Sequence, residues 1–407
     1  MTTAGPTDTS SVAAPQEKTA PPTGSTSGAI VELDHVTKRY GPPGTPPAVN
    51  ELSLTIPAGE ICVLVGPSGC GKTTTMKMIN RLVEPTSGRL TIDGRDVTQL
   101  SAVDLRGGIG YVIQQVGLFP HMTVGANTGV VPRLLRWPEA RIRERVDELL
   151  DLVGLDPAAY RDRYPAELSG GERQRVGVAR ALAADPPVML MDEPFGAVDP
   201  IRRDRLQNEF LRLQARVRKT IVFVTHDVDE AIKMADRIAI LQRGGILAQY
   251  DTPDAILAHP ANEFVERFVG ADRGLKRLSL ARVRDLELIQ PVTVQAGAER
   301  TDASRDLRAS AVDYALLLDD GGRPLGWIRE SDLSGQGPIN PDQAMPGASL
   351  LEPETTLRDA LSAMLISSVQ LGVVVDERER VLGLVSVDQI SEVLQSGELP
   401  VRADAAG

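Results

Sequence analysis

The sequence of 407 residues lacks the features that mark secreted, disulfide-bonded or membrane-spanning proteins. It has two cysteines, Cys62 and Cys70, so it offers no disulfide framework, and a reducing cytoplasm is the simpler environment for it. No apolar run approaches the roughly 20 residues that span a bilayer. The N-terminus also lacks the charged and then apolar pattern of a signal peptide. If the protein works at a membrane, we expect another chain to hold it there.

An excess of positive charge is also missing. Lysine and arginine number 44 against 55 aspartates and glutamates, which gives a net charge of -11. Because nucleic-acid binding depends on contacts between basic side chains and phosphates, this balance argues against a nucleic-acid partner. The hydrophobic content of 42% and charged content of 24% are ordinary for a globular protein, and the length suits two or three domains.

Composition divides the chain into four parts. Residues 1–28 are rich in Thr, Ser, Pro, Ala and Gly, which predicts a disordered N-terminal tail. Residues 29–272 alternate apolar strand patterns with helical ones, which predicts an α/β domain with an inserted helical section. Residues 273–397 contain an internal repeat, and residues 398–407 are predicted to be a flexible tail.

Local signals predict several individual elements. Asp93-Gly94 lies between strand-like arms in residues 89–97 and predicts a hairpin. Residues 139–153 form an amphipathic helical pattern that Gly154 ends. Two apolar runs, residues 188–191 and 221–224, predict buried parallel strands.

The repeat aligns residues 312–333 with residues 369–390 without a gap, at an offset of 57 residues. Each copy predicts two short strands around a polar turn, followed by the start of a helix. Residues 357–366 predict a helix before the second copy. We therefore expect two copies of one small α+β module, at about residues 281–335 and 342–396.

The segment Gly66–Thr73 carries the phosphate-binding pattern G-x-x-x-x-G-K-T between an apolar strand, Ile61–Val65, and a helical stretch. Its glycines let backbone N–H groups turn toward phosphate oxygens, and the helix N-terminus adds partial positive charge. Lys72 is expected to reach the β- and γ-phosphates, and the Thr73 hydroxyl to bind Mg²⁺. The residues that this pattern assigns to nucleotide binding are Gly66, Pro67, Ser68, Gly69, Cys70, Gly71, Lys72, Thr73 and Thr74. Because a helix N-terminus favours a thiolate, we expect Cys70 to react with thiol reagents when no nucleotide is bound.

A second apolar strand ends in two carboxylates, Asp192 and Glu193. In a protein with a phosphate-binding loop, such a strand delivers Asp192 to the Mg²⁺ shell and Glu193 to the water that attacks the phosphate. A solvent-facing acidic strand end is the plainer alternative, and the phosphate-binding loop earlier in the chain favours the catalytic interpretation.

Between these motifs lies Leu168–Gln174, with the sequence LSGGERQ, a glycine-rich helix start that Ser169 could simply cap. The stretch also resembles the signature sequence of ABC ATPases, which other P-loop families lack. The resemblance implies a head-to-tail dimer in which this stretch binds the γ-phosphate held by a second copy of the chain. The residues concerned are Ser169, Gly170, Gly171 and Gln174. The resemblance covers about residues 30–272.

Further residues match the order of motifs in that family. Tyr40 resembles the aromatic residue that stacks on adenine, although an edge-strand tyrosine would be its default interpretation. Gln114 resembles the loop glutamine that contacts Mg²⁺ and water, and its neighbour Gln115 leaves the assignment to alignment. Asp199 resembles part of the loop that crosses the dimer interface, and His226 resembles the switch histidine on the γ-phosphate. The resemblance implies catalytic roles for Glu193, His226 and Gln114, and metal ligands in Thr73, Gln114 and Asp192.

The C-terminal region resembles that of one importer group. Residues 264–280 are similar to the join after the cassette in importers of quaternary amines, and the repeat resembles the tandem CBS pair that this group carries. CBS modules bind adenosine-type ligands through a Gly, two apolar residues, Ser or Thr, and then Asp three positions later. The first copy has Arg329 in place of Ser or Thr, and the second has Gln389 in place of Asp. A dimerisation or regulatory module without a firmly bound nucleotide therefore stands beside one that binds an adenine-type or cyclic dinucleotide regulator.

The fold class implied by these resemblances is α/β: a P-loop NTPase cassette of the ABC type, followed by an α+β tandem CBS pair. The cassette would comprise a RecA-like core, an antiparallel β subdomain and a helical subdomain. The implied function is ATP binding and hydrolysis with Mg²⁺, powering import of glycine betaine, proline, choline or carnitine. The implied partners are a second copy, transmembrane permease subunits at the cytoplasmic face of the membrane and, indirectly, a substrate-binding protein.

Three other functions are compatible with parts of the sequence. They are an importer for another small solute, a soluble ABC ATPase of DNA repair or translation, and a CBS regulator with an inactive cassette. A single cassette, the acidic balance and the absence of a heptad run argue against the soluble ATPase. Intact Lys72, Asp192, Glu193 and His226 argue against the inactive cassette. The solute is inferred from the C-terminal features alone, because an ATPase subunit does not touch it.

Overall fold

A computed structural model describes residues 28–42, 44–113, 117–196, 198–300, 304–305, 307, 314–333, 337–345, 347–367 and 369–396. The tails predicted at residues 1–28 and 398–407 lie outside the described residues, with the exception of Gly28. The amide of Gly28 donates to the carbonyl of Arg218 at 3.0 Å, so the folded part begins by this residue.

The main sheet has six strands in the order β10-β9-β3-β8-β7-β6. Its neighbours pair in parallel from β9 to β6, and β10 pairs antiparallel with β9. All residues of β3 and β8 are buried, as expected of strands covered on both faces. The buried strands predicted at residues 188–191 and 221–224 are confirmed as β7 and β8. The bounds are β3 Ile61–Val65, β6 Ile109–Val112, β7 Val188–Asp192, β8 Thr220–Val224, β9 Arg237–Gln242 and β10 Ile246–Asp251.

A second sheet is antiparallel, with the order β2-β1-β4-β5. The predicted hairpin is confirmed between β4 and β5, where Asp93 and Gly94 adopt φ values of 48° and 72°. Two successive positive φ values give the turn whose twist matches that of paired strands. The bounds are β1 Val31–Lys38, β2 Val49–Ile56, β4 Ser87–Ile92 and β5 Arg95–Asp96.

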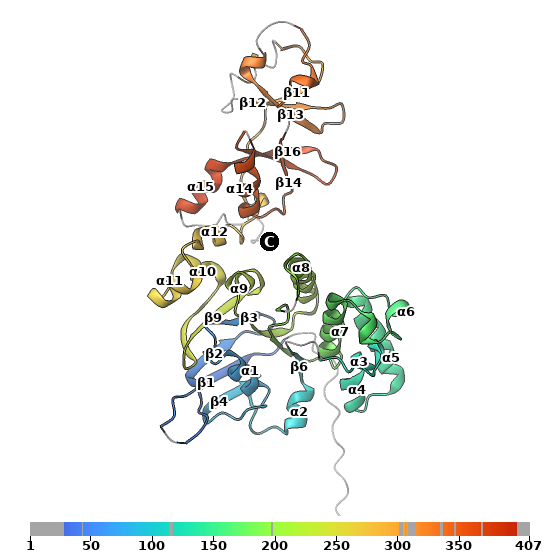
Figure 1. The fold of residues 1–407 in the computed structure, drawn as a ribbon, viewed down its shortest axis with the longest axis vertical. Coiled ribbons are helices and arrows are strands. Elements are labelled where there is room, and N and C mark those ends of the chain that lie inside the picture. Colours follow the sequence, from blue (N-terminus) through green and yellow to red (C-terminus); the bar gives the residue numbers. More distant parts are fainter. Residues whose placement is uncertain are drawn as a thin grey trace, which may run out of the picture.

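Helices α3 to α7 form a group beside the main sheet, at the right in Figure 1, whereas α2 lies below β6 in this view. The predicted amphipathic helix is confirmed as α5, whose buried positions Ile142, Val146, Leu149 and Leu150 recur at helical spacing. Gly154 follows its end with a φ of 71°, a conformation that suits glycine. The bounds are α2 Ala102–Gly107, α3 Val124–Thr128, α4 Val130–Leu134, α5 Glu139–Leu152, α6 Pro157–Tyr160 and α7 Gly170–Leu182.

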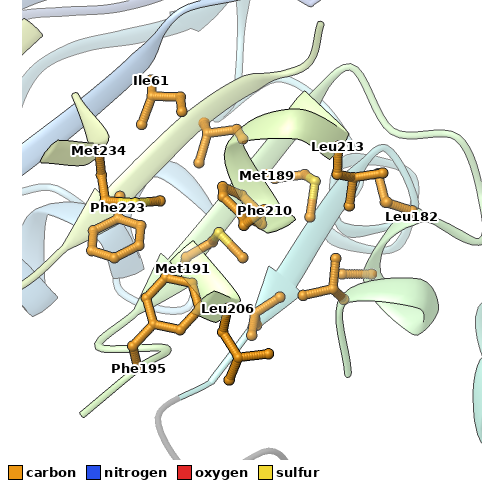
Figure 2. Close-up of a cluster of buried hydrophobic side chains, with 14 of the residues drawn as sticks. Ile61, Leu182, Met189, Met191, Phe195, Leu206, Phe210, Leu213, Phe223 and Met234 are labelled. Carbon is orange, nitrogen blue, oxygen red and sulfur yellow. The ribbon is translucent and has the colours of Figure 1, made fainter. Parts of the chain in front are cut away.

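The largest hydrophobic cluster packs α8, Pro200–Val217, against the main sheet. Figure 2 shows Met189 and Met191 of β7 and Phe223 of β8 facing Leu206, Phe210 and Leu213 of α8. Phe195 lies between these elements, with ring centroids 6.2 Å from Phe210 and 6.0 Å from Phe223. This packing fixes the segment that leaves the end of β7.

Four short helices continue the chain after β8 and β10: α9 Val228–Met234, α10 Pro253–Ala258, α11 Glu263–Val269 and α12 Arg273–Arg277. Helix α12 is fastened to the residues before it by two ion pairs. Arg277 pairs with Asp254 at 2.7 Å, and Lys276 lies 3.5 Å from Asp229. Leu278, directly after α12, belongs to a cluster with residues of α14 and β15, so α12 contacts both parts of the chain.

The C-terminal part contains two three-stranded sheets, β11-β12-β13 and β14-β15-β16. In each, the first pair is parallel and the second antiparallel. Strands β12 and β13 correspond to β15 and β16 at the offset of 57 residues, which confirms the repeat, and the helix predicted at residues 357–366 is confirmed as α14. The bounds are β11 Thr293–Gln295, β12 Tyr314–Leu318, β13 Pro324–Arg329, β14 Ser349–Leu351, β15 Leu371–Val375, β16 Val381–Ser386, α14 Leu357–Ile366 and α15 Val387–Ser396.

The two predicted ranges, residues 281–335 and 342–396, exchange short segments with each other. Ile289, near the start of the first range, pairs antiparallel with Leu384 of the second. Met345, near the start of the second range, pairs antiparallel with Trp327 of the first. Each copy thus receives an edge segment from the other, because the leading segment reaches across instead of folding back.

The remaining described elements are single 3₁₀ turns at Pro165–Glu167, Val283–Asp285, Glu330–Leu333 and Pro341–Gln343. Within the described ranges, none of the helices has the length and apolar character that a bilayer crossing requires.

Candidate active site

The phosphate-binding loop joins β3 to α1, Lys72–Ile79, as the sequence predicts. Gly71 precedes the helix with a φ of 103°, and a Cβ there would lie 2.5 Å from the carbonyl of Ala48. Both observations require glycine at this position. The first-turn amides of a helix have no carbonyl partner within the helix, so those of α1 are available to an anion at the loop.

Lys72 lies inside the curl of the loop. Its ammonium donates to the carbonyl of Gly66 at 2.7 Å and to that of Pro67 at 3.3 Å. The amide of Cys70 donates to the carbonyl of Pro67 at 3.2 Å, which closes the turn and leaves Ser68 and Gly69 exposed. The positive charge is therefore held by two loop carbonyls and by the Cys70 sulfur, 3.7 Å away.

The reactivity expected of Cys70 is not supported. Its side chain is 1% exposed and belongs to the hydrophobic cluster around β1, β2 and α1. The loop curls so tightly that a Cβ on Gly66 would lie 2.7 Å from the Cys70 sulfur. The sulfur also lies 3.7 Å from the Lys72 ammonium, so the thiol is a buried packing residue beneath the loop.

Thr73 and Asp192 meet at the edge where β3 and β7 end. Burial, followed by the nearby charge of Glu193, raises the pKa of Asp192, while Lys77, a hydrogen bond with the Thr73 hydroxyl and Lys72 oppose the rise. The Thr73 hydroxyl and the half-buried carboxylate of Asp192 are thus hydrogen-bonding neighbours. The described residues contain no cluster of three or more His, Cys, Asp or Glu side chains that could hold a metal by themselves.

Glu193 and His226 face each other across neighbouring strand ends. The Nδ1 atom of His226 lies 3.1 Å from Oε1 of Glu193. Glu193 has a φ of 43°, and its amide donates to the carbonyl of Val224 at 2.9 Å. Because β7 and β8 are parallel neighbours, both side chains emerge at the same edge as Asp192 and the phosphate-binding loop.

Three other predicted residues contact different neighbours or lie outside the described residues. Tyr40, just after β1, is 50% exposed, and Nζ of Lys38 lies 5.2 Å from its ring centroid. Asp199 caps α8 by accepting from the amide of Arg202 at 3.1 Å. Gln114 lies outside the described residues, as does its neighbour Gln115.

The LSGGERQ stretch lies elsewhere in the molecule. Ser169 caps α7 through a reciprocal pair of bonds with Glu172, of 3.3 Å and 2.7 Å. Gly170 and Gly171 form the first turn of α7, and Gln174 is buried behind them. In Figure 1, α7 lies away from α1, with β6 between them in this view. One chain therefore does not bring Ser169 to its own phosphate-binding loop.

Sequence reasoning missed two contributors. Lys77 lowers the pKa of Asp192, and its spacing of four residues from Thr73 on α1 could have indicated a shared face. The hydroxyl of Tyr160 donates to Oε1 of Glu172 at 2.6 Å, and no sequence motif contains Tyr160.

Comparison with known proteins agrees with this geometry. The family model described as ABC transporter matches residues 49–196, which include the loop, the LSGGERQ stretch and Asp192. The osmoprotectant import ATP-binding protein OsmV of Salmonella typhimurium is 46% identical over 371 residues, covering 90% of this chain and 97% of the relative. The chain belongs to the ABC transporter family. A second relative of this ABC protein is the glycine betaine/carnitine/choline transport ATP-binding protein OpuCA of Bacillus subtilis. It is 47% identical, with coverage of 90% of this chain and 96% of the relative.

Two further matches concern the domains of this ABC protein. The CBS domain model matches residues 350–396, which lie in the second copy of the repeat. The solved structure of cbiO1 from Clostridium perfringens, part of an ABC transporter complex, aligns with a TM-score of 0.54 at 24% identity. The alignment covers 62% of this chain and 95% of that one, and it shows the shared ABC cassette fold.

Proposed function

We propose that this chain is the ATP-hydrolysing subunit of an ABC importer for quaternary amine osmoprotectants, such as glycine betaine, proline, choline or carnitine. We place its cassette at residues 29–272 and its C-terminal CBS module at residues 273–397. The observation that carries the ATPase activity is the meeting of Lys72, Thr73, Asp192, Glu193 and His226 at one edge of the sheet.

The site suits ATP with Mg²⁺. Thr73 and Asp192 would hold the ion, because a hydroxyl and a carboxylate are hard oxygen ligands, and phosphate oxygens would complete its shell. Mg²⁺ would neutralise charge on the phosphates. The α1 amides and Lys72 would bind the phosphates, Tyr40 would stack on the adenine, and Gln114 would contact the ion and the water.

Glu193 and His226 would carry the hydrolytic step. Glu193 would accept a hydrogen bond from the attacking water and take its proton. His226, 3.1 Å from the same carboxylate, would orient Glu193 and contact the γ-phosphate. Phosphoryl transfer to water depends mainly on positioning and charge neutralisation, which these groups and Lys72 would supply.

A second copy is needed to complete the site in this proposal. Ser169, Gly170, Gly171 and Gln174 lie apart from the loop of their own chain, so they would bind nucleotide held by a partner. Asp199 would lie at the contact between the two copies. The dimer would be held at the cytoplasmic face of the membrane by permease subunits, which receive solute from a substrate-binding protein.

The solute class rests on the relatives and on the C-terminal module. Both relatives named above cover nine-tenths of this chain and are named for osmoprotectant or for glycine betaine, carnitine and choline transport. In the CBS module, Gln389 accepts from the amide of Ser386 at 3.0 Å and donates to the carbonyl of Glu287 at 2.8 Å. Since Gln389 is already bonded within the chain, the geometry favours a regulatory or dimerisation module without an adenine-type or cyclic dinucleotide ligand at this position.

The test is the variant Glu193→Gln. It keeps the size of the side chain and its backbone conformation but removes the base, so phosphate release should fall about 100- to 10,000-fold while ATP binding persists. Binding of a fluorescent ATP analogue and release of inorganic phosphate would be measured on the same preparation, with Glu144→Gln, at an exposed position of α5, as a surface control. Near-normal turnover in Glu193→Gln would refute the role of Glu193. Absence of turnover in the unmodified chain assembled with its permease would refute the function.

A further inference from the structure

The carboxylate of Glu172 links two parts of the helical section. Its Oε1 accepts from the Tyr160 hydroxyl at 2.6 Å, and its Oε2 accepts from the Ser169 amide at 2.7 Å. The Ser169 oxygen in turn accepts from the Glu172 amide at 3.3 Å. Tyr160 ends α6, whereas Ser169 and Glu172 open α7, so the tyrosine reaches the serine through the carboxylate.

We propose that Tyr160 is a positioning residue for the ATPase reaction: through Glu172, its hydroxyl fixes Ser169 in the orientation that completes the nucleotide site of a second copy. The proposal rests on the proposed function, because Ser169 needs a nucleotide partner for its orientation to matter.

The chemistry of Glu172 supports a fixed connection. Hydrogen bonds from Tyr160 and then from Ser169, with the charge of Arg175 nearby, lower the pKa of Glu172 to about 2. Glu172 is therefore an ionised, two-sided acceptor at neutral pH, and hydrogen bonds to an ionised group are stronger than neutral ones. Arg175, also in α7, lies 3.8 Å from Glu209 of α8. Tyr160 donates to Glu172 from a different helix, α6.

Two contacts hold the ring of Tyr160 in place. Its ring packs against the main hydrophobic cluster, and the guanidinium of Arg163 lies 4.5 Å from the ring centroid. Leu168 is buried in the same cluster directly before Ser169, but a Cβ on Gly170 would meet nothing within 4 Å, so no packing contact holds position 170 next to Ser169. The orientation of Ser169 depends on its bonds to Glu172, and these depend on the hydroxyl that restrains the carboxylate.

The experiment compares Tyr160→Phe with Tyr164→Phe in the full chain. Tyr164 is a neighbouring tyrosine, 47% exposed and outside the link through Glu172. We expect Tyr160→Phe to lower kcat about tenfold, equivalent to about 1.4 kcal/mol, and to leave binding of a fluorescent ATP analogue to the single chain unchanged. In the Glu193→Gln background, the same change should weaken the dimer that ATP induces, as measured by size-exclusion chromatography. Tyr164→Phe should alter none of these values.

A second comparison separates positioning from folding. In a Glu172→Gln background, Tyr160→Phe should have little further effect on kcat, because the tyrosine acts only through the carboxylate. Equal additional losses in both backgrounds would overturn the proposal, as would a kcat of Tyr160→Phe equal to that of Tyr164→Phe. If Tyr160→Phe fails to fold, Glu172→Gln alone gives the decision: unchanged kcat and dimerisation overturn the proposal, and losses in both support it. An inactive wild-type chain would instead refute the proposed function.

Discussion

Replacing Gly383 with alanine would test the exchange of edge segments between the two C-terminal copies. Gly383 lies on β16 at the point where Ile289 crosses from the other copy. A Cβ at Gly383 would lie 2.7 Å from the Cβ of Leu288 and 3.2 Å from the carbonyl oxygen of Ile289. The corresponding glycine of the first copy, Gly326, has the same surroundings, since its Cβ would lie 2.5 Å from the carbonyl oxygen of Met345.

The size of the effect follows from these distances. Unbonded carbons prefer a separation of about 3.5–4.0 Å, so the crossing segment must move by roughly 1 Å. Overpacking of this kind costs about 1–3 kcal/mol. The movement also strains the two backbone hydrogen bonds between Ile289 and Leu384, of 2.9 Å and 2.8 Å, each of which contributes about 1 kcal/mol. A loss of about 2–4 kcal/mol would lower the melting temperature of the module by roughly 10 °C.

The assay is differential scanning calorimetry of the full chain with and without ATP and Mg²⁺. Ligand binding stabilises the part that binds it by about 2.7 kcal/mol at a hundredfold excess over Kd, so the transition that ATP does not move belongs to the C-terminal module. Gly274→Ala is the matched control, because its Cβ would lie in ordinary contact, 3.5 Å from Leu394, on helix α12. If Gly383→Ala lowers the temperature of the ATP-insensitive transition no more than this control does, the proposed exchange of segments between the two copies is refuted.

Two other predictions concern the cassette and its connection to the module. Cys62 and Cys70 are 0% and 1% exposed, so a thiol reagent should modify neither in the native chain, with or without ATP, although both should react after denaturation. Rapid loss of one thiol from the native, ATP-free protein would contradict the burial of Cys70. Arg277→Ala removes the 2.7 Å pair with Asp254, and because the Asp254 side chain is 43% exposed the cost should be reduced to about 1 kcal/mol. Limited proteolysis should then cleave faster after α11, and an unchanged cleavage pattern would show that this ion pair does not hold α12.

Local signals predicted the elements that hold the candidate site. Strand β3, the loop and α1 follow one another within a few residues, so the spacing of the motif alone predicts a phosphate-binding loop between a strand and a helix. Asp192 and Glu193 follow an apolar strand for the same reason. The meeting of His226 with Glu193 needed one further step, the parallel pairing of β7 and β8, which the two buried apolar runs indicated.

Other features could not be predicted because they depend on contacts between separate elements. The Tyr160 hydroxyl reaches Glu172 only because α6 packs beside the start of α7. The place of Cys70 at a helix N-terminus predicts a reactive thiol, but the loop directs its side chain into a hydrophobic cluster. In each case, the direction of a side chain follows from packing that no short pattern encodes.

The C-terminal repeat separates what the sequence determines from what only the tertiary structure decides. The sequence by itself determined that two similar units exist, because the strands of each copy recur at a fixed offset and a Leu-Gly pair recurs with them. Only the tertiary structure decided that each unit is completed by a segment from the other. The glycines are compatible with either arrangement, since they permit a close approach of any backbone, and only the tertiary contacts show which backbone approaches.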